Sequence, residues 1–342
     1  MREAKYYKKL KKNKVQCQLC NHFCALDDGE LGICHVRKNI KGKLYSLVYN
    51  HPVALQLDPI EKKPFFHFCP GSASFSLGTF GCNFRCKNCQ NYEISQESAV
   101  EQKVKYLPEV KPEQIVQQAV EAKAQSIAYT YVEPTIFAEY ALDIMKLARK
   151  KGLKNVWVSN GFMSEEFLRD LLPLLDAINI DLKSFEDEFY REIAGGRLEP
   201  ILENIKTVKQ SKVHLELTTL VIPTLSDDLK MLQKIIDFIY KEVGPETPWH
   251  ISRFSGAISW QLKHLPATDV QLLEAIYQKA KKRGLQYVYL GNVLDPDKEN
   301  TYCPQCNKLA VRRLGYQIER LDDNGHCRYC GADLNIKCID FK

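Results

Sequence analysis

The chain has 342 residues, of which 45% are hydrophobic, and its 48 Lys and Arg against 42 Asp and Glu give a formal net charge of +6. These figures support one large domain with small appendages, and the near balance of charge argues against a nucleic-acid-binding protein. The sequence has no signal peptide, lipidation motif or apolar run of spanning length, which predicts a cytoplasmic protein without membrane attachment. Its 13 cysteines favour metal chemistry over disulfide bonds, because cytosolic thiols are kept reduced.

Residues 1–14 form a polar lead that is rich in lysine. A short lysine run is typical of a solvated helix face, so we predict a helix of modest order there rather than a nucleic-acid-binding patch.

Four cysteines come next, and Gly29 and Gly32 permit tight turns that fold a short loop onto a metal. Four thiolates could close a tetrahedral zinc site or hold a second iron–sulfur cluster. Nothing in the spacing is specific for iron and sulfide, so zinc is the simpler interpretation. We place this N-terminal four-cysteine metal-binding module and its lead-in within residues 1–73. Its four predicted ligands are Cys17, Cys20, Cys24 and Cys34.

From Ser74 onward, short apolar runs rich in β-branched or aromatic residues alternate with helical stretches. Such runs are typical of strands buried on both faces. The alternation predicts parallel strands with helical crossovers, and so an α/β fold, a partial (β/α)6-type TIM barrel over residues 74–292 whose active site lies at the C-terminal strand ends. The predicted strands are Ser74–Phe80, Ile127–Val132, Val156–Ser159, Ala177–Leu182, His214–Ile222, Trp249–Ser252 and Tyr287–Leu290.

Helices can be predicted between these strands. Apolar residues recur at helical spacing before Gly152 and again from Leu229 onward. Ser164 is followed by two glutamates and suits an N-cap. Thr268 and Gln271 have the spacing of a capping box, which predicts that a helix begins directly after Thr268.

Three cysteines, Cys82, Cys86 and Cys89, stand at C-x3-C-x2-C spacing after the first predicted strand. A ferredoxin-type cluster or a structural zinc site would want a fourth ligand, and the nearest candidates are Cys69 and His67. We therefore interpret the three thiolates as ligands of three irons of a 4Fe–4S cluster. This spacing is the signature of radical S-adenosylmethionine (SAM) enzymes, and the resemblance implies that the fourth iron chelates the SAM amino and carboxylate groups. The alternative is a zinc knuckle or a set of buried thiols.

The second predicted strand ends in Tyr129-Thr-Tyr-Val-Glu133-Pro134, where the glutamate could accept a charge-assisted hydrogen bond from an ammonium group. The segment matches the Gly-Gly-Glu-Pro segment by which many radical SAM enzymes contact the SAM amino group. Tyr131 and Val132 stand here in place of the two glycines. The alternative role for Glu133 is to cap the helix that begins near Thr135.

Asn160, Asp181 and Lys183 occur at the ends of the third and fourth predicted strands. Similar Thr-Asn-Gly and Asp-Leu-Lys segments line the SAM site of glycyl-radical-enzyme activases, typified by the activase of pyruvate formate-lyase. The resemblance implies that these residues lie in the cofactor site, whereas an isolated Asp and Lys would be a surface ion pair. His250 and Arg253, at the end of the sixth strand, could position the substrate or the SAM carboxylate, although a strand histidine is more often a satisfied core residue.

Residues 293–342 form the last predicted module. Two C-x2-C pairs there predict a structural zinc ribbon with four thiolate ligands, and the alternative is a degenerate ribbon without metal. The two cysteines that belong to no group, Cys69 and Cys338, are expected to pack as small apolar residues. The ribbon ligands are Cys303, Cys306, Cys327 and Cys330.

A series of motifs spans the chain between its first and last cysteine groups. They are Cys17-x2-Cys-x3-Cys24, Gly32-Ile-Cys34-His-Val-Arg37, Asp58-Pro-Ile-Glu-Lys-Lys-Pro64, Gly78-Thr-Phe-Gly-Cys82, Cys89-Gln-Asn-Tyr92-Glu-Ile-Ser95, Ala128-Tyr-Thr-Tyr-Val-Glu-Pro-Thr135, Gly195-Gly-Arg-Leu-Glu-Pro200, Arg253-Phe254, Tyr289-Leu-Gly-Asn-Val293 and Glu299-Asn-Thr-Tyr-Cys-Pro304. With them the chain resembles the radical SAM enzyme of the AmmeMemoRadiSam system, which is related to the pyruvate formate-lyase activases. The resemblance suggests that Memo-like and AMMECR-like proteins act in the same system.

Three functions are compatible with these features. The first is an oxidoreductase-type enzyme that takes one electron from a donor such as flavodoxin or ferredoxin, cleaves SAM to methionine and a 5′-deoxyadenosyl radical, and abstracts a hydrogen atom from a substrate. The second is a glycyl-radical-enzyme activase, whose substrate is a protein with a glycine loop. The third, a non-catalytic metal-binding or nucleic-acid-binding module, would give the open cluster loop no purpose. The sequence does not identify the substrate.

Overall fold

Seven apolar runs of the chain form the parallel strands of one central sheet. The computed structural model describes residues 1–338, and the sheet has the order β14-β13-β12-β11-β10-β9-β8-β7. Strands β8 to β14 are parallel to one another, and β7 pairs antiparallel with β8. The strands are β7 (Ala54–Pro59), β8 (Ala73–Gly78), β9 (Ser126–Tyr129), β10 (Lys154–Ser159), β11 (Ala177–Asp181), β12 (His214–Val221), β13 (Trp249–Arg253) and β14 (Val288–Gly291).

All seven predicted strands are confirmed as β8 to β14. The fold is α/β with a mostly parallel sheet, and β7 and β14 are its edges, so the sheet is open within residues 1–338. The apolar runs identified these strands because most of their residues are buried on both faces, as in β9, where all four residues are buried. Since parallel strands align their carboxyl ends, the loops after β8 to β14 meet at one edge of the sheet.

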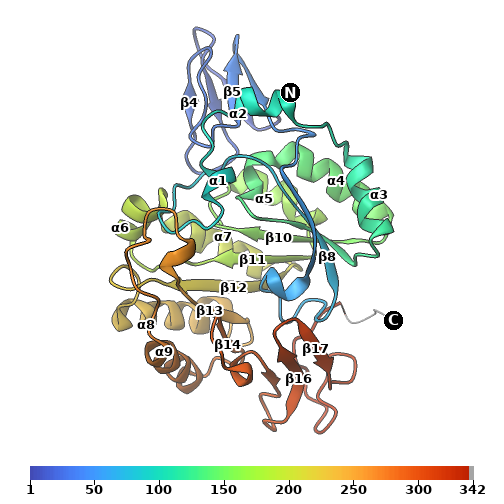
Figure 1. Ribbon diagram of the computed structural model, residues 1–342, viewed down its shortest axis with the longest axis vertical. Helices are drawn as coiled ribbons and strands as arrows, with labels where there is room; N and C mark the ends of the chain where they lie inside the picture. Colours follow the sequence, from blue (N-terminus) through green and yellow to red (C-terminus); the bar gives the residue numbers. More distant parts are fainter. Residues whose placement is uncertain (339–342) are drawn as a thin grey trace.

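Helices connect the parallel strands and cover the sheet (Figure 1). The helices predicted before Gly152 and from Leu229 are confirmed, and the Ser164 hydroxyl accepts a hydrogen bond from the Phe167 N–H, as expected of an N-cap. The helices are α1 (Tyr92–Ser95), α2 (Val100–Lys103), α3 (Pro112–Glu121), α4 (Ala138–Lys150), α5 (Glu165–Leu171), α6 (Asp187–Phe189), α7 (Glu199–Lys209), α8 (Leu229–Phe238) and α9 (Val270–Arg283).

The capping box at Thr268 and Gln271 is wrong by one residue. The N-cap of α9 is Asp269, whose side chain accepts a hydrogen bond from the Gln271 N–H. The Thr268 hydroxyl is used elsewhere, because it donates to the Val221 carbonyl oxygen at 2.6 Å and accepts from the Phe254 N–H at 2.9 Å. A tertiary contact therefore replaces the local cap that the sequence predicts.

The helix predicted over residues 1–14 is also wrong. Tyr7–Lys9 form strand β2, which pairs with Val15–Cys17, and Lys12 and Asn13 turn the chain at φ 55° and 57°. The lysines of this segment lie in and around strand β2 and in the turn after it instead of on a helix, because the chain there is paired with the first cysteine-bearing strand. The N-terminal strands are β1 (Arg2–Glu3), β2 (Tyr7–Lys9), β3 (Val15–Cys17), β4 (Ala25–Leu26), β5 (Arg37–Ile40) and β6 (Lys43–Ser46).

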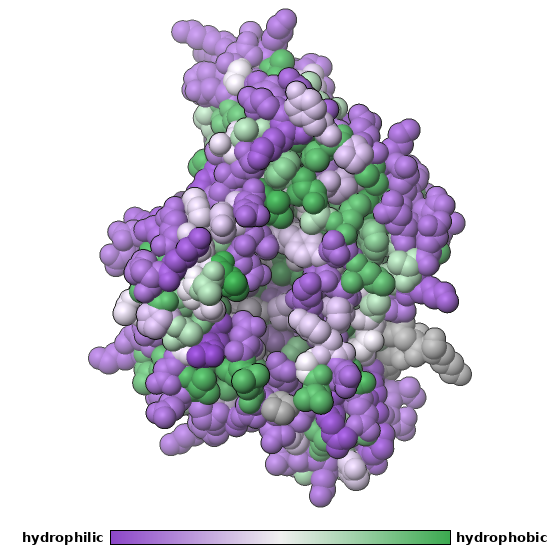
Figure 2. Space-filling model, viewed as in Figure 1, coloured by the Kyte–Doolittle hydropathy of each residue, from purple (hydrophilic) through white to green (hydrophobic). Residues whose placement is uncertain are grey.

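The two small modules lie at opposite ends of the long axis. In Figure 1 the N-terminal strands are at the top and the C-terminal strands at the bottom, with the central sheet between them. Figure 2 shows that hydrophilic side chains cover most of this face, with hydrophobic groups scattered among them. No helix in residues 1–338 is long and apolar enough to cross a membrane. The C-terminal strands are β15 (Thr301–Tyr302), β16 (Leu309–Leu314) and β17 (Gln317–Arg320).

Cys69 and Cys338 form a disulfide bond. The expectation that both pack as single thiols is therefore wrong. The segment before Cys338 runs beside the loop that carries Cys69, because the Cys69 N–H donates to the Lys337 carbonyl at 3.0 Å and the Lys337 N–H donates to the His67 carbonyl at 2.8 Å. This pairing brings the two Cα atoms to 4.8 Å. The sequence separation of 269 residues hides the contact from any local pattern.

A buried polar network fills the space at the amino ends of β12, β13 and β14. Glu216 accepts hydrogen bonds from the backbone N–H groups of Phe66 and His67 at 3.0 and 2.8 Å, and from His250 Nε2 at 2.7 Å. His214 Nε2 lies 3.1 Å from the same carboxylate. Burial alone would raise the pKa of Glu216, but the two histidines lower it well below its usual range. The carboxylate is therefore stable as an anion in the core.

The C-terminal module is joined to this network through Arg313. Its guanidinium donates to the Phe66 carbonyl at 2.7 Å and to the Thr301 hydroxyl at 2.8 Å, and it lies 4.2 Å from the centre of the Phe66 ring. Thr301 in turn is hydrogen-bonded to the Tyr289 hydroxyl at 2.8 Å. A fully buried arginine with these partners fixes the ribbon strands against the sheet.

We expect Arg313→Ala to lower the free energy of unfolding by about 3–5 kcal/mol, because several buried acceptors lose their donor at once. Arg312 on the same strand is the matched control, since it pairs with Glu319 while both side chains are more than half exposed. Arg312→Ala should change stability by less than about 1 kcal/mol. Denaturant unfolding of both variants measures the difference, and equal effects would contradict the role given to Arg313.

Candidate functional site

The loop of residues 79–91, called the cluster loop below, carries Cys82, Cys86 and Cys89 and directly follows β8. It is held by backbone contacts from two other parts of the chain. The Lys87 N–H donates to the Ile193 carbonyl at 2.9 Å, and the Lys87 carbonyl accepts from the Gln261 N–H at 2.8 Å. The three thiols therefore lie at the carboxyl edge of the parallel strands, where the predicted fold places chemistry.

The three sulfur atoms lie in largely buried surroundings and have separate partners. Cys82 Sγ accepts from the Phe84 N–H at 3.4 Å, and Cys89 Sγ lies 3.2 Å from Ser95 Oγ. Burial raises the pKa of the Cys86 thiol to about 11. Without a metal this thiol is neutral near pH 7, so a metal that binds here displaces its proton. Three thiols that are not gathered around one point fit a multinuclear cluster better than one tetrahedral ion, which needs four close ligands.

Glu133 lies beside the cluster loop and is 3% exposed. Its carboxylate accepts hydrogen bonds from the Thr135 hydroxyl at 2.5 Å, the Ser159 hydroxyl at 2.9 Å and the Asn160 N–H at 2.7 Å. The Thr135 N–H, in the first turn of a short helix, also donates to it at 3.1 Å. Burial raises the pKa of Glu133 even though these donors oppose the shift. The capping contact is thus present, and the contact with the SAM amino group stays a prediction.

Tyr131 occupies the position of a motif glycine and adopts a glycine-like backbone conformation, with φ 70°. A positive φ at a bulky residue costs about 1–3 kcal/mol and persists only where the surroundings hold it. Here the Tyr131 hydroxyl donates to Asp58 at 2.6 Å, the Lys63 ammonium lies 4.3 Å from the ring centre, and the Tyr131 carbonyl accepts from Asn91 of the cluster loop at 2.7 Å. The backbone geometry that glycine would supply is therefore retained.

The structure brings Lys183 and Asp181 together with Cys86. The Lys183 ammonium donates to Asp181 at 2.7 Å. Burial disfavours the charged form of Lys183, but the neighbouring Asp181 carboxylate and Cys86 thiolate together raise the pKa of Lys183 above its usual value. This pair is therefore not a typical surface ion pair, because it holds a permanent positive charge beside a predicted cluster ligand.

Asn160 also lies beside the cluster loop, with its Nδ2 donating to Asn83 Oδ1 at 2.8 Å. His250 and Arg253 lie farther along the sheet. His250 is bonded to Glu216 and packs edge-on against Phe66, with ring centres 4.7 Å apart. Arg253 is half-buried and its Nε donates to the Thr268 carbonyl at 2.9 Å. Their assignment to SAM or substrate stays a prediction, and His250 is already committed to the buried network.

The buried network is the part of the site region that sequence reasoning missed. His214 and Glu216 are two residues apart on one strand, so both point to the same face of the sheet. That spacing, together with His250 on the next strand, was the available signal.

The four ribbon cysteines converge as predicted. Their sulfur atoms all lie within 4.8 Å of one another, and the Cys303–Cys330 and Cys306–Cys327 pairs are each 3.5 Å apart. Within residues 1–338 this is the one group of three or more His, Cys, Asp or Glu with ligand atoms gathered for a single ion. The N-terminal cysteines instead line a small cavity beside the cluster loop.

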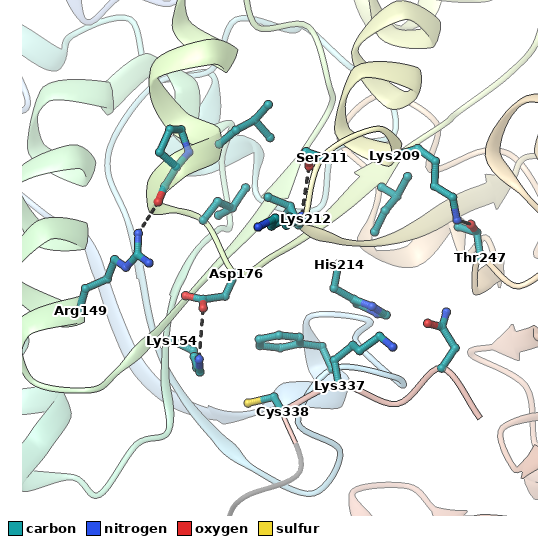
Figure 3. A pocket seen from close by; sticks show the side chains of 17 residues that line it. Arg149, Lys154, Asp176, Lys209, Ser211, Lys212, His214, Thr247, Lys337 and Cys338 are labelled. Carbon is teal, nitrogen blue, oxygen red and sulfur yellow. Dashed lines mark hydrogen bonds and ion pairs between the residues drawn. The ribbon is translucent and has the colours of Figure 1, made fainter. Parts of the chain in front are cut away.

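A separate cavity lies at the opposite edge of the sheet from the cluster loop, near the amino ends of β10 and β12. It has a volume of 620 Å³, and Figure 3 shows basic side chains around it, with Lys154 paired to Asp176 at 3.3 Å. Its lining includes none of Cys82, Cys86 and Cys89, so the candidate site is assigned by its chemistry rather than by cavity size. The basic residues that line it are Arg149, Lys154, Lys209, Lys212 and Lys337.

Comparisons with known proteins agree with this geometry. Residues 77–239 match the family described as the radical SAM superfamily. An uncharacterised protein of Methanocaldococcus jannaschii is 42% identical over 339 residues, which is 98% of this chain and 99% of that protein. The chain belongs to the radical SAM superfamily. As a member it is expected to bind a 4Fe–4S cluster and SAM.

More distant relatives of this radical SAM protein include activating enzymes. The pyruvate formate-lyase-activating enzyme of Clostridium pasteurianum is 23% identical over 164 residues, which cover 46% of this chain and 66% of that enzyme. Among solved structures, Streptococcus suis SuiB bound to precursor peptide SuiA has a TM-score of 0.50 at 13% identity, over 68% of this chain and 51% of that one. The structural likeness concerns the fold alone.

We predict that the ribbon binds one zinc ion with a structural role. A zinc–sulfur distance of about 2.3 Å places tetrahedral sulfurs about 3.8 Å apart, close to the spacing seen here. Elemental analysis should find about one zinc per chain that is absent from Cys303→Ser/Cys327→Ser. Cys338→Ser is the control, because Cys338 is not in the ribbon group, and it should keep its zinc. A parent protein that folds without zinc would contradict the prediction.

We also predict that Glu133→Gln weakens SAM binding by about tenfold to a hundredfold while leaving the cluster content unchanged. The expected loss is that of one charge-assisted hydrogen bond to an ammonium, roughly 1.5–3 kcal/mol. SAM titration of the reconstituted protein measures it, with the exposed Glu165→Gln as the control. If Glu133→Gln binds SAM as the parent does, Glu133 acts as a helix cap and another group holds the amino group.

Proposed function

We propose that this chain is a radical SAM enzyme that cleaves SAM reductively to methionine and a 5′-deoxyadenosyl radical, which abstracts a hydrogen atom from a substrate. The observation that supports the proposal most directly is the cluster loop itself. It presents three thiols, and no more, at the carboxyl edge of a parallel sheet, beside Lys183 and Glu133. When bound through Cys82, Cys86 and Cys89, a 4Fe–4S cluster supplies the electron for this cleavage.

The residues around the cluster loop have separate roles in the proposal. Lys183 holds a positive charge next to Cys86, where it offsets the negative charge of the thiolates and can pair with a carboxylate. Asn160 fixes the cluster loop through Asn83, and Tyr131 fixes it through Asn91. These contacts orient the ligands and keep water away from the sulfurs, while the electron itself comes from a flavodoxin- or ferredoxin-type donor.

A glycyl-radical-enzyme activase is the second candidate. The similarity to pyruvate formate-lyase-activating enzymes favours it, although it covers less than half of this chain. The sequence motifs favour instead the AmmeMemoRadiSam system, in which Memo-like and AMMECR-like proteins would be partners. Mass spectrometry of candidate partner proteins and of cell extract, with and without SAM, would distinguish a modified protein glycine from another substrate.

We expect the anaerobically reconstituted protein to release 5′-deoxyadenosine and methionine from SAM in the presence of dithionite. Replacing Cys82, Cys86 and Cys89 together with Ala should abolish this release and remove about four irons per chain. Chromatography of the products and iron analysis measure both effects. The matched control is Cys303→Ser/Cys327→Ser, which should keep its iron. A triple variant that still cleaves SAM would refute the assignment.

A further inference from the structure

The four N-terminal cysteines surround one enclosed space. Cys17, Cys20, Cys24 and Cys34 all line a cavity of about 20 Å³, which also includes Arg37 and, from the cluster loop, Asn83. Cys17 and Cys34 are buried, and the other two are partly buried. Three of the cysteines precede the Gly29–Gly32 turn and one follows it. The turn therefore folds the chain back so that both segments line the cavity.

The spacing of these sulfurs differs from that in the ribbon. A single tetrahedral zinc ion holds its sulfurs about 3.8 Å apart, and the sulfurs of the ribbon lie close to that spacing. The N-terminal thiols are not gathered in this way, because the ribbon is the one single-ion group within residues 1–338. They are therefore spaced more widely than the ligands of one ion, as the ligands of a multinuclear cluster are.

Two buried donors in the wall of this space have no partner. Arg37 and Asn83 are each 1% exposed, and neither Arg37 Nε nor Asn83 Nδ2 makes a hydrogen bond to any residue described. The rest of each side chain is satisfied, since Arg37 pairs with Glu139 and Asn83 Oδ1 accepts from Asn160. A buried unpaired donor is unfavourable, so both indicate an acceptor inside the cavity.

A zinc site would offer these donors only its four thiolate sulfurs, whereas an iron–sulfur cluster adds inorganic sulfides that also accept hydrogen bonds from surrounding donors. Gly32 provides room for such a group. A Cβ on Gly32 would lie 3.7 Å from Cys34 Sγ and 3.9 Å from Cys24 Sγ, so any side chain there would extend beside these two sulfurs.

The N-terminal module is packed directly on the cluster loop. His22 Nε2 lies 2.8 Å from the Asn83 carbonyl oxygen, and a Cβ on Gly81 would overlap the Cys34 carbonyl oxygen. Figure 1 shows the same arrangement, with α1 at the end of the cluster loop below the N-terminal strands and the ribbon at the far end of the molecule. One wall of the cavity therefore belongs to the loop that carries the other three thiols.

We propose that Cys17, Cys20, Cys24 and Cys34 hold a second iron–sulfur cluster, with Arg37 and Asn83 donating hydrogen bonds to its sulfides. This replaces the zinc interpretation that the spacing alone favoured. The proposal rests on the proposed function only in taking Cys82, Cys86 and Cys89 as the ligands of the first cluster. It assigns different metals to the two four-cysteine modules, iron with sulfide next to the cluster loop and zinc in the ribbon.

The test is metal and sulfide analysis of the full-length chain after anaerobic reconstitution with iron, sulfide and zinc together. The Cys82→Ala/Cys86→Ala/Cys89→Ala variant should retain iron and acid-labile sulfide in equal amounts, with the electron paramagnetic resonance signal of a reduced cluster. Cys20→Ala/Cys24→Ala should keep only the first cluster, and Cys303→Ser/Cys327→Ser should lose zinc but no iron. The parent protein should contain more iron than the four atoms of one 4Fe–4S cluster.

Two zinc ions per chain, with no iron or sulfide in the triple variant, would overturn the proposal. So would a parent protein with only four irons, a measurement that does not depend on the folding of any variant. Neither result affects the proposed function, which is tested by release of 5′-deoxyadenosine from SAM. Conversely, a protein that does not cleave SAM but retains sulfide-bound iron at the N-terminal cysteines would leave this inference standing.

Discussion

The position of the cluster loop depends on two close contacts at glycines, one within the loop and one in a segment that packs against it. Neither contact leaves room for a side chain at the glycine. At Gly81 the obstacle to a Cβ is the carbonyl oxygen of Cys34, and at Gly196 it is the ring of Phe84. Both contacts involve residues within or next to the thiol-bearing segments. The loop, the N-terminal module and the turn at Gly196 thus form one packed unit, and a shift in any of them moves the thiols.

The buried charged groups at the two edges of the sheet differ in how many partners they have. At the amino ends Glu216 is surrounded by donors that leave its carboxylate no free lone pair for a ligand. At the carboxyl ends Lys183 has one carboxylate partner, Asp181, and its charge opposes the effect of burial on the pKa of the Cys86 thiol. A buried charged group whose hydrogen bonds are all made stabilises the fold. A buried charged group with few partners can take part in binding or chemistry.

The sequence predicted the parallel strands well because burial on both faces leaves continuous apolar runs, which need no long-range information. It failed where a tertiary contact replaced a local one. Thr268 has the spacing of a cap but bonds to Val221 and Phe254, so Asp269 caps the helix. Tyr131 replaces a glycine of the motif, yet its side-chain contacts hold it at a positive φ that glycine adopts readily. These contacts are made by residues far away in the sequence, so the local sequence around Tyr131 does not predict them.

The attachment of the ribbon through Arg313 also has a consequence for how the protein is made. Its guanidinium, which emerges late from the ribosome, binds the carbonyl of Phe66, which emerges early, across 247 residues. Until Arg313 has been synthesised, Thr301 and the Phe66 carbonyl lack this partner. The contact between Arg313 and Phe66 is therefore among the last of the long-range contacts that the chain can form, and the ribbon docks after the strands of the sheet have been synthesised.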